Sequence, residues 1–152
     1  MTMTTGGALS QVSVGDAQVE MFSGGSGPPL LFLHGAGGNS GWQGYHEELS
    51  KSYTVYVPSQ AGFNGTERPD WLYTINDLAH FNLELVQALG LDHFILMGFG
   101  VSTAVSLSVA RKATRASTSS SNIRSLYLSG ILPFLYCLSN PSAFQLFGSN
   151  IF

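Results

Sequence analysis

A glycine-rich turn, HGAGG at residues 34–38, carries the most specific signal for chemistry in this sequence. It comes directly after the apolar run at residues 30–33 and is followed by Trp42, which would open a helix. Glycines let the backbone turn tightly and approach a ligand, which leaves N–H groups free to hold an anion. The pattern also fits an ordinary turn between a strand and a helix, but the histidine and Trp42 favour a functional one. We therefore expect a binding turn formed by His34, Gly35, Ala36 and Gly37.

The elements that must position this turn alternate between strand and helix. Apolar runs at residues 30–33, 53–57 and 94–97 are typical of strands that are buried on both faces. Residues 42–50 and 75–89, which lie between these runs, are helix candidates. Alternation of this kind predicts an α/β fold with a mostly parallel, doubly wound sheet.

The helix expected at residues 75–89 has both a start signal and a stop signal. Thr74 is a plausible cap, and Asp77 is a short variant of the acid in a capping box. Gly90 is the expected stop, because glycine readily adopts the backbone conformation that ends a helix.

An N-terminal hairpin and two weaker elements complete the expected organisation. Residues 11–14 and 18–22, separated by a Gly-Asp pair, predict an antiparallel hairpin at one edge of the sheet. Residues 101–115 continue as a helix although they contain several serines, which prefer caps and turns, and residues 123–128 could add a strand. The expected division of the chain is a flexible N-terminus at residues 1–9, an α/β core at residues 10–130 and an apolar, divergent tail at residues 131–152.

Four segments together resemble the α/β-hydrolase family. They are HGAGGNSGW, YTVYVPSQAGFNGTERP, INDLAHFNLELVQALGL and HFILMGFG. Their order and spacing carry the resemblance, which covers residues 10–115 and reappears weakly at residues 122–128. Within the family it points to serine esterases and to hydrolases that cleave carbon–carbon bonds. The resemblance implies a small-molecule carbonyl substrate or ligand and a core that is incomplete at its C-terminus.

The resemblance also implies a nucleophile elbow, G-x-S-x-G, in the turn after residues 94–97. Aligned without a gap, the sequence GFGVS places Gly100 at the nucleophile position and Ser102 at the final glycine. Ala36 and Val101 would then supply the two donors of an oxyanion hole. A shifted alignment would make Ser102 the nucleophile; otherwise Ser102 is a helix residue in the first turn that bonds its own backbone.

A serine nucleophile of this fold needs an acid and a histidine later in the chain. No Asp, Glu or His follows residue 93, so we expect the chain to end before both groups. The four histidines precede the elbow, and each has an ordinary structural interpretation. We expect His34 in the oxyanion turn, His46 and His80 on helices, and His93 before a buried strand.

Other ligand classes lack their sequence signatures. A dinucleotide site is disfavoured because Ser40 and Thr103 stand where the third glycine of a G-x-G-x-x-G motif would lie. No GK[ST] motif follows a glycine-rich turn, and no H-E-x-x-H spacing occurs, so we expect no cofactor and no metal. The late Lys and Arg residues lie in a Ser-rich stretch without interleaved aromatic residues, which disfavours nucleic-acid binding.

Composition predicts a globular, cytoplasmic protein. The net charge is −3, and 44% of residues are hydrophobic, whereas only 10% are charged, compared with about 25% in typical domains. A single cysteine, Cys137, excludes an internal disulfide, and the N-terminus lacks the charged and apolar regions of a secretory signal. The longest apolar tract, residues 126–138, is shorter than the ~20 residues of a transmembrane helix. The oligomeric state is not predicted.

Three functional states follow from these observations. The chain is a hydrolase by descent for an ester or a carbon–carbon bond, or a non-catalytic module that binds a small molecule, or an inactive truncated product. The apolar tail favours truncation, because an exposed tail of this composition promotes aggregation.

Overall fold

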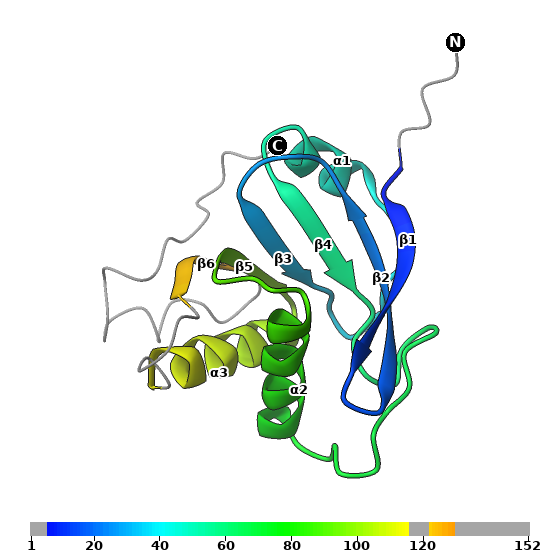
Figure 1. Ribbon diagram of the computed structural model, residues 1–152, viewed down its shortest axis with the longest axis vertical. Helices are drawn as coiled ribbons and strands as arrows, with labels where there is room; N and C mark the ends of the chain where they lie inside the picture. Colours follow the sequence, from blue (N-terminus) through cyan, green and yellow to red (C-terminus); the bar gives the residue numbers. More distant parts are fainter. Residues whose placement is uncertain (1–5, 116–121, 130–152) are drawn as a thin grey trace.

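The computed structural model describes residues 6–115 and 122–129, so the expected tail at residues 131–152 lies outside the described residues. These residues form one sheet of six strands in the order β1-β2-β4-β3-β5-β6, with three helices packed on it (Figure 1). The strands are β1 (Ala8–Val14), β2 (Ala17–Gly24), β3 (Pro29–Leu33), β4 (Thr54–Pro58), β5 (His93–Phe99) and β6 (Asn122–Ser129). The helices are α1 (Gly44–Ser50), α2 (Ile75–Ala88) and α3 (Ser102–Arg115).

Four adjacent strands of the sheet are parallel, which confirms the expected α/β class. β4, β3, β5 and β6 run in the same direction, whereas β1 and β2 form the expected antiparallel hairpin at the edge. After β3 the chain turns to one side to form β4, and it then crosses to the other side to form β5. The reversal creates a topological switch point between β3 and β5, at whose carboxyl ends ligands of such sheets bind.

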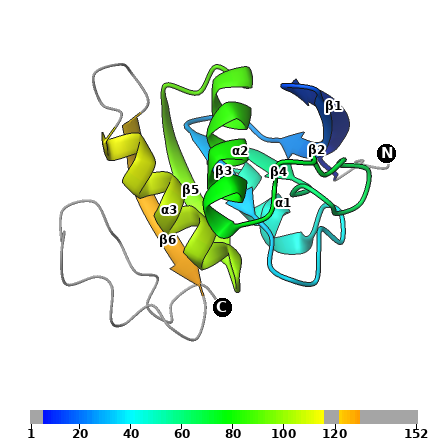
Figure 2. The same ribbon diagram turned by 90° about the horizontal axis from the view of Figure 1, so that it is seen from below.

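Both faces of β3 are covered because its apolar side chains alternate between two layers. Leu31 and Leu33 pack in a core with residues of α2 and α3, which lie side by side on one face (Figure 2). Leu30 and Phe32 pack in a second core with residues of β4, Trp42 and Leu49 on the side of α1. The continuous apolar runs therefore predicted the doubly covered strands correctly.

Local signals define the ends of the helices. Thr74 caps α2 and exchanges hydrogen bonds with Asp77, so the predicted capping box is confirmed. Gly90 follows that helix with a φ of 65°. Trp42 does not open α1, as the sequence had suggested: Gln43 is the cap, and its N–H donates to Nδ1 of His46.

The serine-rich segment at residues 101–115 does form a helix, α3, from Ser102 onward. Tertiary contacts outweigh its poor propensity, because Val105 and Val109 are buried in the core shared with α2 and β5. Across residues 6–115 and 122–129, no helix has the length and apolar character needed to cross a bilayer.

Candidate functional site

Two glycine-rich turns meet at the carboxyl ends of β3 and β5. The first, residues 34–38, leaves β3, and the second, residues 99–101, joins β5 to α3. A Cβ built on Gly100 would lie 3.7 Å from the Cα of Gly35. A Cβ on Gly35 would lie 3.2 Å from the carbonyl oxygen of Phe99, so the two turns are in close contact. The structure thus brings together the residues that the sequence singled out, and it does so at the switch point of the sheet.

Gly100 holds the backbone conformation of a sharp strand-to-helix elbow. Its φ is 59°, in the left-handed region that L-residues enter only with strain. The residues on either side project outward, since Phe99 is 56% exposed and Val101 is 60% exposed. Gly100 therefore stands at the exposed tip of the elbow, between two accessible apolar side chains.

Two backbone N–H groups next to this tip are unused. In the part of the chain that the structure describes, no hydrogen bond occupies the N–H of Ala36 or that of Val101. Both residues are exposed, and Val101 immediately precedes α3, whose N-terminus favours negative charge. The site can therefore offer donors to a carbonyl or anionic oxygen.

His34 orients the turn that contains Ala36. Its Nε2 accepts a hydrogen bond of 2.9 Å from the backbone N–H of Gln60, which leaves the proton on Nδ1. Nδ1 donates to the carbonyl oxygen of Gly35 at 2.8 Å. That carbonyl and the N–H of Ala36 belong to one planar trans peptide and point in opposite directions. Fixing the carbonyl of Gly35 therefore fixes the direction of the Ala36 donor.

Burial keeps His34 in the neutral form that this arrangement requires. Loss of solvation lowers the pKa of His34 from its ordinary value, and the hydrogen bond to Gly35 only partly opposes the effect. Protonation of Nε2 would turn that atom into a donor facing another donor, the N–H of Gln60.

Ser102 lies beneath the elbow rather than at its tip. It is fully buried as the first residue of α3, and its hydroxyl donates to the carbonyl oxygen of His34. The side-chain nitrogen of Gln60 donates to the same carbonyl oxygen at 2.9 Å and also to the Ser102 hydroxyl. The three residues form one buried polar cluster that connects the exits of β3 and β4 with the start of α3.

Gln60 and Asn39 are site residues that sequence reasoning missed. The side chain of Asn39 donates to the carbonyl oxygen of Val57 at 3.2 Å and so connects the exits of β3 and β4. Both residues follow buried parallel strands, at the edge where ligands of such sheets bind. That position was a signal available in the sequence, whereas their hydrogen-bond partners were not.

The remaining histidines lie where the sequence placed them. His46 is on α1 and is buried against the rings of Phe32 and Tyr45. His80 is on α2 and its Nε2 lies 3.4 Å from a carboxylate oxygen of Glu84. His93 is exposed at the start of β5.

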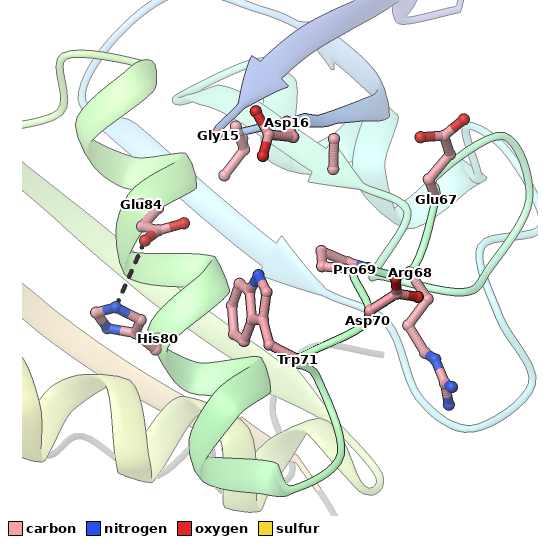
Figure 3. A pocket seen from close by; sticks show the side chains of 11 residues that line it. Gly15, Asp16, Glu67, Arg68, Pro69, Asp70, Trp71, His80 and Glu84 are labelled. Carbon is pink, nitrogen blue, oxygen red and sulfur yellow. Dashed lines mark ion pairs between the residues drawn. The ribbon is translucent and has the colours of Figure 1, made fainter.

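A surface hollow of about 650 Å³ lies elsewhere, between the β1–β2 turn, residues 67–71 and α2 (Figure 3). Its wall carries the carboxylates of Asp16, Glu67, Asp70 and Glu84. It includes no residue of the two glycine-rich turns. Across the described residues, no group of three or more His, Cys, Asp or Glu side chains is arranged to hold a metal ion. The hollow is therefore separate from the candidate site.

Comparison with known proteins identifies the family of the chain. The family described as alpha/beta hydrolase fold matches residues 28–149. This chain belongs to the α/β-hydrolase family. The matched range includes both glycine-rich turns and extends through most of the apolar tail.

Two curated relatives of the chain have the names of enzymes. The chain is 31% identical over 104 residues to pyrrolizixenacetamide deacetylase of Xenorhabdus hominickii, which covers 67% of this chain and 39% of that protein. It is 30% identical over 103 residues to 2-(acetamidomethylene)succinate hydrolase of Mesorhizobium japonicum, covering 67% and 37% of the two chains. A crystal structure of E-2-(acetamidomethylene)succinate hydrolase superposes with a TM-score of 0.70 at 27% identity, covering 80% of this chain and 43% of that one. The chain thus spans less than half the length of these relatives.

Proposed function

We propose that this α/β-hydrolase chain binds a small carbonyl compound at the two glycine-rich turns without attacking it. The N–H groups of Ala36 and Val101 hold the carbonyl oxygen, and the exposed side chains of Phe99 and Val101 contact the apolar part of the ligand. The observation that carries the proposal is Gly100, which occupies the elbow tip with a φ of 59°. Glycine has no side-chain oxygen, so the tip carries no nucleophile.

This proposal depends on a residue inside the chain and not on where the sequence ends. A histidine or an acid supplied from elsewhere would not provide an attacking atom at Gly100. The relatives named as a deacetylase and as a 2-(acetamidomethylene)succinate hydrolase support the class of ligand, a carbonyl compound, because acetyl and acetamide groups each contain a carbonyl.

The alternative candidate keeps hydrolysis and assigns the nucleophile to Ser102. Its support is the family, whose members include the hydrolases described above. Against it stands the burial of Ser102, whose hydroxyl is bonded to the carbonyl oxygen of His34. A nucleophile must meet its substrate within about 3–3.5 Å, and this hydroxyl is covered by protein.

One titration tests the proposal. Ethyl butyrate is added to isotopically labelled protein while amide resonances and released ethanol are measured together. We expect saturable shifts of the Ala36 and Val101 amides with no ethanol. Unchanged Ala36 and Val101 amides across the titration would overturn the binding site, and ethanol released in proportion to protein would overturn the lack of chemistry.

Covalent labelling separates the two candidates. A fluorophosphonate probe reacts with activated serines, and peptide mass spectrometry locates the adduct. We expect Ser102 to remain unmodified in protein whose amide spectrum shows a folded chain. A phosphonylated Ser102 would establish the alternative, in which the elbow is shifted and the chain retains a nucleophile.

A further inference from the structure

We propose that the Ser102 hydroxyl and the Gln60 side-chain amide are positioning groups. By donating hydrogen bonds to the carbonyl oxygen of His34, they set the direction of the Ala36 N–H. This inference rests on the proposed function for its ligand, and it assigns to Ser102 a task other than nucleophilic attack. In the sequence, Ser102 stands where the G-x-S-x-G motif has its final glycine.

The carbonyl oxygen of His34 is held by two donors from different parts of the fold. One is the hydroxyl of Ser102 at the start of α3, and the other is Nε2 of Gln60, which follows β4, at 2.9 Å. Gln60 also donates to the Ser102 hydroxyl, so the two donors support one another. The cluster is buried, and hydrogen bonds shielded from water are stronger and more cooperative than exposed ones.

These bonds control two successive peptide planes. The carbonyl of His34 belongs to the peptide that joins it to Gly35, and the ring of His34 holds the carbonyl of the next peptide. Each peptide is planar, so the Ala36 N–H takes its direction from the anchored carbonyl of Gly35, and the anchored carbonyl of His34 fixes the plane before it. Glycine at position 35 would otherwise leave this segment free to rotate. The two hydrogen bonds to the His34 carbonyl therefore restrict the direction of the Ala36 N–H, two residues away.

Ser106 shows that a buried hydroxyl in this helix need not have such a role. It lies one turn after Ser102 on the same side of α3 and is also fully buried. Its hydroxyl oxygen has no hydrogen-bond partner within the described part of the chain. Both serines are fully buried on α3. They differ because only the Ser102 hydroxyl donates to the carbonyl of His34.

A set of four variants tests the inference on the whole chain. The variants are Ser102→Ala, Gln60→Met, the double variant and the control Ser106→Ala. Ethyl butyrate affinity is measured at a temperature at which thermal unfolding shows every variant to be folded. We expect Ser102→Ala and Gln60→Met each to weaken binding about fivefold, as the loss of one hydrogen bond implies. Ser106→Ala should bind as the wild type does.

The double variant distinguishes positioning from a general loss of structure. Both single changes remove hydrogen bonds from the same network at the His34 carbonyl, so their effects on affinity should not add. The double variant should bind ethyl butyrate no more than about twofold more weakly than either single variant. Fully additive losses would overturn the inference, as would an equal loss in Ser106→Ala.

Backbone amide shifts provide a reading that does not depend on the ligand. In Ser102→Ala and Gln60→Met, the Gly35 and Ala36 amide resonances should move, and in Ser106→Ala they should not. If the wild type does not bind ethyl butyrate, the proposed function fails, and these shifts alone decide the positioning role. Unmoved resonances would overturn it. Gln60→Met suffices for this reading if Ser102→Ala does not fold.

Discussion

A Cβ added to Gly100 would meet only Gly35 within 4 Å in the described part of the chain. A Cβ on Gly100 would lie 3.7 Å from the Cα of Gly35, which is an ordinary van der Waals distance. The elbow thus accommodates the first atom of a side chain, which its glycine does not carry. Crowding at the Cβ position does not explain the glycine, whereas the backbone angle opposes an L-residue there.

Gly100→Ser should therefore fold with a modest loss of stability. An L-residue at a φ of 59° costs about 1–2 kcal/mol, measurable by urea unfolding. Gly98→Ala provides the contrast, because its Cβ would lie 2.6 Å from the carbonyl oxygen of Ser102. Overpacking of this kind costs about 1–3 kcal/mol and requires the backbone to move. A larger loss in Gly100→Ser than in Gly98→Ala would contradict the finding that a Cβ fits at the elbow without a clash.

Ser102→Ala and Ser106→Ala should differ in stability although both remove a buried hydroxyl. Ser102→Ala removes one of the two donors to the His34 carbonyl and one acceptor of the Gln60 amide, whose direct bond to each other remains, at a cost of about 1 kcal/mol. Ser106→Ala removes an oxygen that has no partner in the described part of the chain and should be neutral or stabilising. Chemical denaturation in parallel compares the two. Equal losses would show that the polar cluster contributes nothing beyond packing.

The free energy of unfolding should fall as the solution is acidified, because His46 is buried without charge. Burial lowers the pKa of His46 to about 4 from an unfolded value of 6.5. Between these limits the unfolded chain binds a proton at His46 that the folded chain does not, so stability is complete above pH 6.5 and declines toward pH 4. The full effect is about 3 kcal/mol, and His34 acts in the same sense.

His46→Gln is the matched variant for this pH dependence. Glutamine at the third helical position can accept the hydrogen bond from the N–H of Gln43, yet it does not titrate. Stability measured from pH 4 to 7 should therefore vary less in the variant than in the wild type. An unchanged slope would show that His46 does not control it, and a resonance assigned to the His46 ring that titrates near 6.5 would contradict its burial.

Thr74→Ala should destabilise the protein by about 1 kcal/mol, because the side chain of Thr74 accepts from the N–H of Asp77 at the start of α2. Thr74→Ser keeps the accepting oxygen and should retain most of the stability. Thermal or urea unfolding measures both variants. An equal loss in the two would indicate that the methyl group of Thr74, rather than its cap, stabilises the helix.

The sheet and its helices could be predicted because their signals are local. The run at residues 30–33 is apolar at every position, as a strand with two covered faces must be. Thr74, Asp77 and Gly90 marked the ends of α2. The start of α1 was placed too early at Trp42, because the capping group at this helix is His46, which is not a standard capping residue.

The hydrogen bonds within the candidate site could not be predicted in the same way. The bond between Ser102 and His34 joins residues separated by 68 positions in the chain. No local pattern marks such a pair, and propensity alone treats Ser102 as a poor helix residue. Its partners depend on how the ends of β3, β4 and β5 are arranged in three dimensions. Sequence motifs located the two turns, and only the fold shows what holds them together.

Glycine at the elbow tip has a consequence for the evolution of this chain. A side chain at that point imposes strain on folding, which a catalyst retains in exchange for reactivity. Gly100 adopts the same backbone angle without that strain. A lineage that replaces a nucleophile by glycine here relieves that strain, and the relief offsets the conformational entropy that glycine loses on folding. The shape of the elbow can therefore outlast its reactivity.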